Sequence, residues 1–180
     1  MQLETLGPLL KSWRRRPLCE PGATRRVVDH GRSAIERILE HRDPFLLVDA
    51  ITDVDLEERC LRGRRRVDPH DPVFAGHFPG RAVYPGVLQL EIMGQMGLCL
   101  IYFCATNSDD IPSDAVPLAA RALKIHHALF QEEVGPGDEL GVLVKLLDSD
   151  AYTATCAGQI VRDGTICAVA LMEVYLVGAS

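Results

Sequence analysis

The sequence predicts an α+β domain in which an antiparallel sheet wraps around one long buried helix. The helix is predicted by an apolar run from Val87 to Phe103 whose polar exceptions are Gln89, Glu91 and Gln95. A helix that is apolar on all sides is normally buried. After this run in the sequence come four strand-like segments separated by turn residues: 118–130, 139–149, 152–162 and 165–177.

The chain of 180 residues, with 47% apolar residues, suits one domain with an ample core. It divides into an N-terminal arm, residues 1–32, and a main domain, residues 33–180. The net charge of −6 argues against nucleic-acid binding. The charge is uneven, because residues 1–33 carry seven basic and three acidic side chains, which leaves −6 − 4 = −10 for the rest.

The arm is predicted to contain a short amphipathic helix, because its apolar residues recur at spacings of three and four. Arg14 to Arg16 and Pro17 follow and end this helix. The pattern is not that of a secretory signal, since the apolar run is short and the charges come after it. The arm could dock on its own protein, contact a partner or a membrane surface, or have no function. Its apolar residues are Leu3, Leu6, Leu9, Leu10 and Trp13.

Between the arm and the apolar run, the pattern predicts one helix and two strands. The helix covers 33–40, with Ser33 as its N-cap and Glu36 at the capping-box position. The strands cover 45–54 and 59–67 and are joined by a turn.

Arginines alternate along the second of these strands, so they share one face of it. They are Arg62, Arg64 and Arg66. This face is predicted to be either a charged edge strand that resists aggregation or a patch that binds phosphate or a carrier protein. The patch would also include Arg65, Arg81 and Lys124.

Cysteines and paired histidines are expected to have structural roles. No two cysteines form a CxxC pair, and no spacing with histidine fits a zinc site, so we expect core thiols in a reducing cytoplasm. The adjacent His126 and His127 should point to opposite faces of a strand, one buried and one exposed. The cysteines are Cys19, Cys60, Cys99, Cys104, Cys156 and Cys167.

The apolar run from Val87 to Phe103 is not expected to span a membrane, because one Glu and two Gln interrupt it and its length is close to the minimum for a span.

Residues that can carry chemistry concentrate just before and inside the apolar helix. His77 lies in the turn Gly76-His77-Phe78-Pro79-Gly80, whose glycines allow the backbone to approach a ligand closely. Glu91 lies among apolar residues, and such surroundings favour the protonated form of a carboxyl group. The helix opens at Pro85-Gly86, where free N–H groups and the positive dipole end can bind a polarised carbonyl oxygen. A base, an acid and an oxyanion site are therefore predicted within one short segment.

These motifs resemble the signature of the bacterial β-hydroxyacyl-acyl carrier protein dehydratases of fatty acid synthesis, which have the hot-dog fold. The likeness covers about residues 33–177. It rests on four stretches: Ile38-Leu39-x-His41-Arg42-x-Pro44-Phe45-Leu46-Leu47-Val48-Asp49, the His77 turn, Pro85-Gly86-Val87-Leu88 with Leu90-Glu91-x-Met93-x-Gln95, and Pro136-Gly137-Asp138.

The resemblance implies that His77 removes the α-proton of a (3R)-3-hydroxyacyl thioester, which becomes a trans-2-enoyl thioester. It implies that Glu91, reaching in from the partner subunit, protonates the leaving 3-hydroxyl, and that the Gly86 N–H polarises the thioester carbonyl. It implies a homodimer with composite active sites, in some members assembled into a trimer of dimers. Because the acid is Glu, and not the Asp of the sister branch that also isomerises the double bond, plain dehydration is expected. Further substrate-binding residues would be Phe78, Tyr84, Val87 and Gln95.

The likeness is incomplete where the family receives its acidic carrier protein. Family members have basic residues before the Pro-Gly-Asp turn, whereas this chain has Ala128-Leu129-Phe130-Gln131-Glu132-Glu133. Other residues must then contact the acyl carrier protein or its phosphopantetheine phosphate. The candidates are Arg81, Arg64 and Lys124.

Two other activities fit part of the pattern. A hot-dog thioesterase would use the carboxylate to direct water at the carbonyl. A non-catalytic dehydratase-like subunit would account for the altered 129–133 stretch, although this alternative does not explain why both His77 and Glu91 are present. No nucleotide or metal motif is present, so no cofactor and no metal are expected beyond the pantetheine arm of the substrate. The pathway would be fatty acid synthesis or a related polyketide or polyene route.

Overall fold

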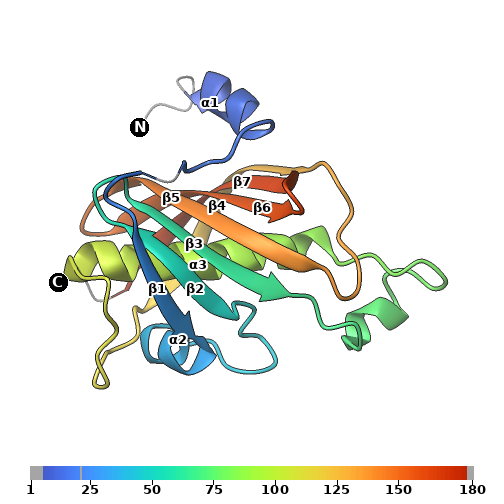
Figure 1. Cartoon of the computed structure of the whole chain (residues 1–180), viewed down its shortest axis with the longest axis horizontal. Coiled ribbons are helices and arrows are strands. Elements are labelled where there is room, and N and C mark those ends of the chain that lie inside the picture. Colours follow the sequence, from blue (N-terminus) through green and yellow to red (C-terminus); the bar gives the residue numbers. More distant parts are fainter. Residues whose placement is uncertain (1–5, 21, 178–180) are drawn as a thin grey trace.

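The computed structural model describes residues 6–20 and 22–177. Within them, seven antiparallel strands form one sheet in the order β1-β2-β3-β5-β6-β7-β4, which curves around helix α3 (Figure 1). This is the predicted α+β arrangement. The helices are α1 (Leu6–Trp13), α2 (Arg32–Ile38) and α3 (Gly86–Thr106), with a 3₁₀ turn η2 at Pro72–Ala75. The strands are β1 (Arg26–Gly31), β2 (Ala50–Asp55), β3 (Cys60–Arg66), β4 (Ala120–Phe130), β5 (Glu139–Ser149), β6 (Thr153–Arg162) and β7 (Thr165–Leu176).

Helix α3 is the centre of the core because its side chains are apolar on nearly every face. It starts at Gly86, after Pro85 at the N-cap, and ends where Asn107 takes a left-handed conformation with φ 48°. Met93 and Met96 are fully buried against the sheet, and each such side chain contributes roughly 1.5–3 kcal/mol. The helix is long and apolar enough to cross a membrane, but 67% of its most apolar window is buried inside the protein, as in a core helix.

Two strand glycines let α3 lie directly on the sheet. A Cβ at Gly158 in β6 would come within 2.7 Å of Met93 Cβ. A Cβ at Gly63 in β3 would come within 2.4 Å of the Ala50 carbonyl oxygen and 2.7 Å of Met96 Cε. Because no side chain fits at either position, the two methionines can pack against strand backbone.

The second half of the sheet matches the sequence prediction closely. The four predicted strands correspond to β4, β5, β6 and β7, with ends that differ by at most two residues. Asp163 and Gly164, at φ 49° and 79°, form the hairpin turn between β6 and β7. The prediction for His126 and His127 is wrong, because both are half-buried. A register shift between Ile125 and His127 interrupts the alternation of faces there.

The first half differs from the prediction in three places. β1 pairs with β2, so the end of the stretch predicted as an arm to residue 32 belongs to the sheet. β2 begins only at Ala50, because residues 45–49 form an irregular segment tied to α3. Ser33 is not the N-cap of α2, because β1 runs straight into the helix and places extended Gly31 at the cap, without a side-chain bond.

The arm covers the outer face of the sheet, opposite α3 (Figure 1). α1 forms where its spacing predicts it, although the predicted Leu3 lies outside the described residues. Trp13 and Leu18 are buried against outward-facing side chains of β5, β6 and β7, including Leu143 and Ala157. Their neighbours along each strand face α3, so strand alternation gives the sheet two apolar faces. Of the three interpretations of the arm, docking on the same protein is confirmed.

A buried glutamine fixes the backbone of the arm. Gln159 on β6 donates from Nε2 to the carbonyl oxygens of Trp13 and Arg16 at 2.6 and 3.0 Å, and its Oε1 accepts from the Leu18 N–H at 2.9 Å. Arg62 donates to a carbonyl oxygen of the arm as well. The edge-strand interpretation of the alternating arginines is wrong, because β3 lies between β2 and β5.

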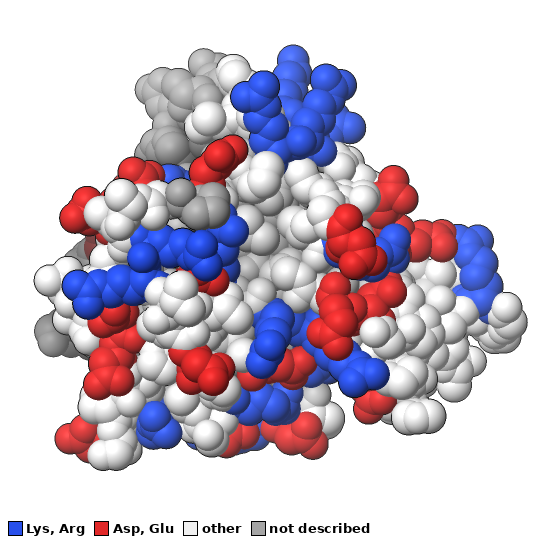
Figure 2. Space-filling view, in the orientation of Figure 1, with Lys and Arg blue, Asp and Glu red and all other residues white. Residues whose placement is uncertain are grey.

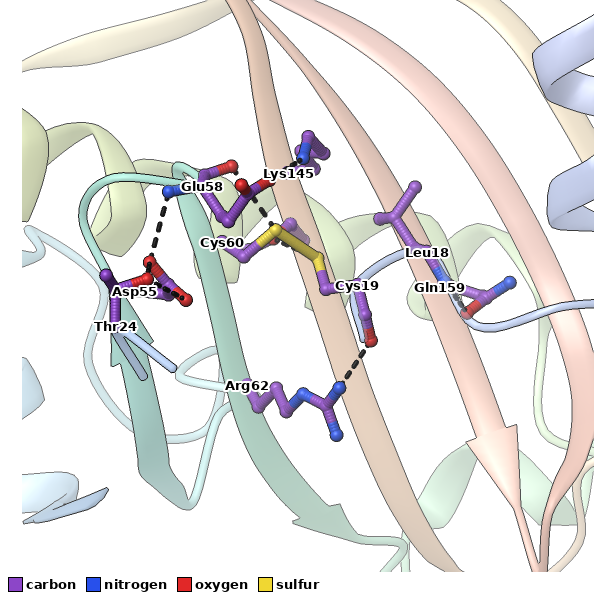
Figure 3. The surroundings of a disulfide bond; sticks show 10 residues. Leu18, Cys19, Thr24, Asp55, Glu58, Cys60, Arg62, Lys145 and Gln159 are labelled. Carbon is purple, nitrogen blue, oxygen red and sulfur yellow. Dashed lines mark hydrogen bonds and ion pairs between the residues drawn. A yellow bond between two sulfur atoms is a disulfide. The ribbon is translucent and has the colours of Figure 1, made fainter. Parts of the chain in front are cut away.

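A disulfide joins Cys19 of the arm to Cys60 at the start of β3, with their Cα atoms 6.3 Å apart (Figure 3). The prediction of free core thiols is wrong for this pair, because docking of the arm brings together two cysteines that are 41 residues apart. The other four cysteines are free, and burial raises the pKa of each thiol, to about 12 for Cys156. A raised pKa makes a thiol unreactive, as expected of a core thiol.

We expect replacement of both Cys19 and Cys60 by Ser to lower the free energy of unfolding by about 2–4 kcal/mol, because the disulfide restricts the unfolded chain. Urea denaturation followed by the fluorescence of Trp13, the only tryptophan, measures the change. A dithiol reductant should lower the stability of the wild type to that of the double variant and leave the double variant unchanged. Equal stability under all these conditions would contradict a disulfide in the native protein.

Candidate active site

His77 lies in a compact turn between η2 and α3. Its N–H donates to the Val73 carbonyl oxygen at 3.0 Å, which ties the turn to η2. Phe78 and Arg81 exchange two backbone hydrogen bonds, at 2.9 and 3.0 Å, across Gly80. Gly80 has φ 79°, a conformation that favours glycine. The glycine and proline content of the motif therefore serves to hold His77 in a defined backbone position.

The imidazole of His77 is oriented by a backbone carbonyl group. Nδ1 lies 2.8 Å from the Val83 carbonyl oxygen, and the Val83 N–H donates back to the His77 carbonyl oxygen at 3.0 Å. A carbonyl oxygen only accepts, so Nδ1 must carry a proton. In the neutral ring, Nε2 is then the nitrogen with the free lone pair, which is the form that a general base requires. The Phe78 ring stacks on the imidazole, with centroids 4.1 Å apart.

The N-terminus of α3 is anchored to the loop that follows β4. The Tyr84 N–H donates to the Val134 carbonyl oxygen at 2.6 Å. The Phe130 ring lies against Gly86, where an added Cβ would come within 2.8 Å of it. The first N–H groups of a helix have no intrahelical partner and sit at the positive end of its dipole. Gly86 therefore has the backbone geometry that an oxyanion site needs.

Glu91 is held by one side chain of α3 and one of the loop that follows α2. Gln95 donates from Nε2 to Glu91 Oε1 at 2.9 Å, and His41 Nε2 lies 3.3 Å from the same oxygen. The Gln95 amide also bonds the Phe45 carbonyl oxygen and the Leu47 N–H, each at 2.8 Å. Gln95 thus fixes both the irregular segment before β2 and one oxygen of the carboxylate.

Glu91 is less buried than the sequence predicts. Its side chain is 31% exposed, and Val87, one turn earlier, is 69% exposed, because the sheet does not fully cover the first turns of α3. No hydrogen bond or ion pair joins Glu91 to His77 in the part of the chain that the structure describes. Within one protomer, the predicted acid and base are therefore not bonded directly to each other.

Of the other residues predicted to bind substrate, two are exposed and two are buried. Phe78 and Val87 are 52% and 69% exposed and open to a ligand. Tyr84 and Gln95 are buried and support the site from behind. The Tyr84 hydroxyl has no hydrogen-bond partner among the described residues, and burial raises the pKa of this phenol, opposed by the nearby Arg65 guanidinium.

The three residues predicted to contact a carrier protein lie on separate elements. Arg81, in the His77 turn, forms an ion pair with Glu133. Arg64 is exposed on β3, and Lys124 is exposed on β4. Because Glu133 offsets the charge of Arg81, this set is a weaker anion-binding surface than the sequence suggests.

Sequence reasoning assigns no role to His41 or Phe130, yet both touch the candidate site. His41 belongs to the upstream motif that carries the family resemblance, which is the signal that could have marked it. Phe130 has no comparable signal, because its contact with Gly86 depends on how β4 ends beside α3. Tertiary contacts of this kind leave no local pattern.

No group of three or more His, Cys, Asp or Glu side chains is arranged to hold a metal ion within residues 6–20 and 22–177. An open cavity of about 580 Å³ lies at the other end of α3, where Arg26, Asn107 and Asp109 are among its lining residues. Its Arg26 is already ion-paired with Asp109. His77 and Glu91 do not line this cavity, so the candidate active site is at the N-terminal end of α3.

Comparison with family models matches residues 39–170 to the FabA-like domain. The chain belongs to the FabA-like family. The 3-hydroxyacyl-[acyl-carrier-protein] dehydratase FabZ of Campylobacter curvus is 33% identical over 143 residues, which are 79% of this chain and 95% of that protein. The dehydratase FabZ of Syntrophotalea carbinolica is 38% identical over 139 residues, 77% of this chain and 89% of that protein. The predicted family is confirmed, while α1, β1 and α2 precede the matched region.

Solved structures confirm the predicted hot-dog fold. The dehydratase heterocomplex ApeI:P from Xenorhabdus doucetiae matches with a TM-score of 0.59 and 19% identity, over 79% of this chain and 90% of that one. A putative thioesterase from Ralstonia eutropha matches with a TM-score of 0.51 and 18% identity, over 70% of this chain and 83% of that one. Since proteins with both titles share the fold, only the side chains of the site can distinguish the two activities.

We expect Gln95→Leu to lower the free energy of unfolding by about 1–3 kcal/mol, because it leaves the Phe45 carbonyl and the Leu47 N–H without their buried partner. Gln89→Leu is the matched control, since Gln89 is also buried in α3 but its Oε1 has no partner among the described residues. Chemical denaturation measures both variants. Equal loss of stability in the two would show that the Gln95 contacts are not important.

Proposed function

We propose that this protein dehydrates (3R)-3-hydroxyacyl thioesters, borne by an acyl carrier protein, to trans-2-enoyl thioesters. The observation that carries the proposal is the His77 imidazole, whose Nδ1 is tied to the Val83 carbonyl oxygen so that Nε2 is the basic nitrogen. Membership of the FabA-like family and relatives named dehydratases support it.

The reaction can be followed atom by atom. Nε2 of His77 takes the α-proton, and the negative charge that develops on the thioester carbonyl oxygen is stabilised by the Gly86 N–H and the α3 dipole. Glu91, initially protonated, gives its proton to the 3-hydroxyl, which leaves as water. The imidazolium of His77 and the carboxylate of Glu91 then return to their starting forms by proton exchange through solvent. Each proton transfer to or from the substrate uses a side chain of this protein, and the developing charge is stabilised by its backbone.

In this proposal, the acid and the base of one site come from two protomers. Glu91 forms no hydrogen bond or ion pair with His77 among the described residues, and part of its side chain faces solvent. A second protomer that covers the first turns of α3 would bury Glu91 and bring it towards His77 of the partner subunit. Burial would also favour the protonated carboxyl group that the reaction needs.

Strand β4 offers the edge on which such a second protomer would pair. Among the described strands, β4 pairs only with β7, so one row of its backbone groups is open. Leu123, Ile125 and Phe130 on β4 are each about half exposed, at 53%, 54% and 46%. An open strand edge with exposed apolar side chains supports a homodimer. A trimer of dimers is the further assembly that the family resemblance implies.

The reverse reaction tests the chemistry. The wild-type protein should hydrate a crotonyl thioester, which is followed as loss of enone absorbance. His77→Ala and Glu91→Gln should each lower kcat by about 10²–10⁴-fold, the usual contribution of a general base or acid. Free-thiol release is monitored in parallel. Thiol release without hydration would indicate a thioesterase, and no reaction of either kind would indicate a non-catalytic subunit.

A mixing experiment tests the composite site. His77→Ala and Glu91→Gln are inactive separately, but subunit exchange at equal amounts should restore about a quarter of wild-type activity, because half the dimers are mixed and each of these has one intact site. Mixing His77→Ala with the His77→Ala/Glu91→Gln double variant is the control and should restore nothing. Equal recovery of activity in both mixtures, or no recovery in either, would contradict the proposal that the acid and the base come from different protomers.

A further inference from the structure

A basic cluster lies on the docked arm, directly after α1. Arg14, Arg15 and Arg16 are exposed, as is Lys11 within α1. Lysine and arginine side chains gather over this part of the molecule in Figure 2. Building on the proposed function, we infer that this cluster is the surface that receives the acidic carrier protein bearing the acyl chain.

The cluster has a fixed position on the sheet. The N–H groups of Arg15 and Arg16 both donate to the Ser12 carbonyl oxygen, at 2.9 and 3.0 Å. The side chain of Gln159 donates a hydrogen bond to the Arg16 carbonyl oxygen, and the Cys19–Cys60 disulfide fixes the arm again just after the cluster. The arginine side chains therefore project from an anchored backbone, so little order must be gained when a partner binds.

The cluster is connected by contacts to the end of α3 where the reaction is proposed. Arg14 Nε donates to Gln131 Oε1 at 3.2 Å, and Gln131 Nε2 donates to the Arg14 carbonyl oxygen at 3.0 Å. Gln131 directly follows Phe130, whose ring lies against Gly86. A carrier protein must approach this end of the molecule, because its pantetheine arm would deliver the thioester to Gly86.

The adjoining surface of the main domain is acidic. Glu132 and Glu133 follow Gln131, and the nearby Arg81 is ion-paired with Glu133. Like charges brought together across an interface oppose binding, so this surface alone would repel an acidic protein. Arg14 is bonded to Gln131, the residue before these glutamates, so the arm places the opposite charge next to this stretch.

The overall charge distribution points the same way. Residues 1–33 carry +4, and residues 34–180 carry −10. Arg15 and Arg16 form no ion pair with another described residue, so their charge is available to a partner. An anionic membrane is a weaker match, because Trp13 is packed against the sheet and cannot insert into lipid.

The test compares two charge reversals of equal size. Arg15→Glu/Arg16→Glu alters the cluster, whereas Arg26→Glu/Arg59→Glu is the matched control at the other end of α3, where both arginines line cavities with Asn107. Crotonyl-loaded acyl carrier protein and crotonyl-pantetheine are hydrated in parallel. The cluster variant should raise KM for the carrier substrate about tenfold or more, with kcat and turnover of crotonyl-pantetheine unchanged. The control should match the wild type on both substrates, and thermal unfolding checks that all proteins are folded.

Fluorescence anisotropy of labelled holo-carrier protein gives the same comparison without catalysis, so failure of docking and failure of the dehydratase reaction are read separately. The affinity of the wild type should weaken with salt, and that of the cluster variant should change little. Unchanged KM and affinity in the cluster variant would overturn the inference, as would equal losses in the control. Wild-type binding to phosphatidylglycerol vesicles that the cluster variant loses, with its carrier KM unchanged, would assign the cluster to a membrane surface instead.

Discussion

The packing of α3 on the sheet is the contact on which the rest of the structure depends. Met93 lies on Gly158 and Met96 on Gly63, at distances that leave no room for a side chain on either strand. Met93 is two residues from Glu91, and Gly86 is the first residue of the same helix. The packing that forms the core therefore also sets the position of the proposed acid and of the proposed oxyanion site.

A sheet that buries a helix on one face still has an outer face, and this chain covers its outer face with its own arm. Leu143, Ala157 and Val169 would be exposed apolar side chains without Trp13 and Leu18 above them. The buried amide of Gln159 satisfies arm backbone groups that would otherwise lack partners. The arm precedes residues 39–170, so this cover comes from outside the region matched to the family domain.

The sequence predicts the features that leave a local pattern and misses those that depend on distant contacts. The apolar run of α3 and the turn signals around β4 to β7 repeat over many residues, so those elements and the His77 turn are predicted almost residue by residue. The Cys19–Cys60 disulfide and the approach of His41 to Glu91 join separate segments, and no spacing encodes them. The partial exposure of Glu91 is missed for a related reason. Apolar neighbours in the sequence do not indicate whether the same protomer or another one buries the Glu91 side chain.

The base and the acid of the proposed site differ in what determines their state. The tautomer of His77 depends on Val83, six residues away in the same turn, so one protomer can prepare its base alone. Glu91 has one oxygen fixed by Gln95 and His41, but solvent still reaches its side chain. In the proposed homodimer, the second protomer would remove that solvent and favour the protonated acid. Under the proposed dimer, assembly would therefore control the acid and leave the base unaffected, and catalysis would be a property of the oligomer.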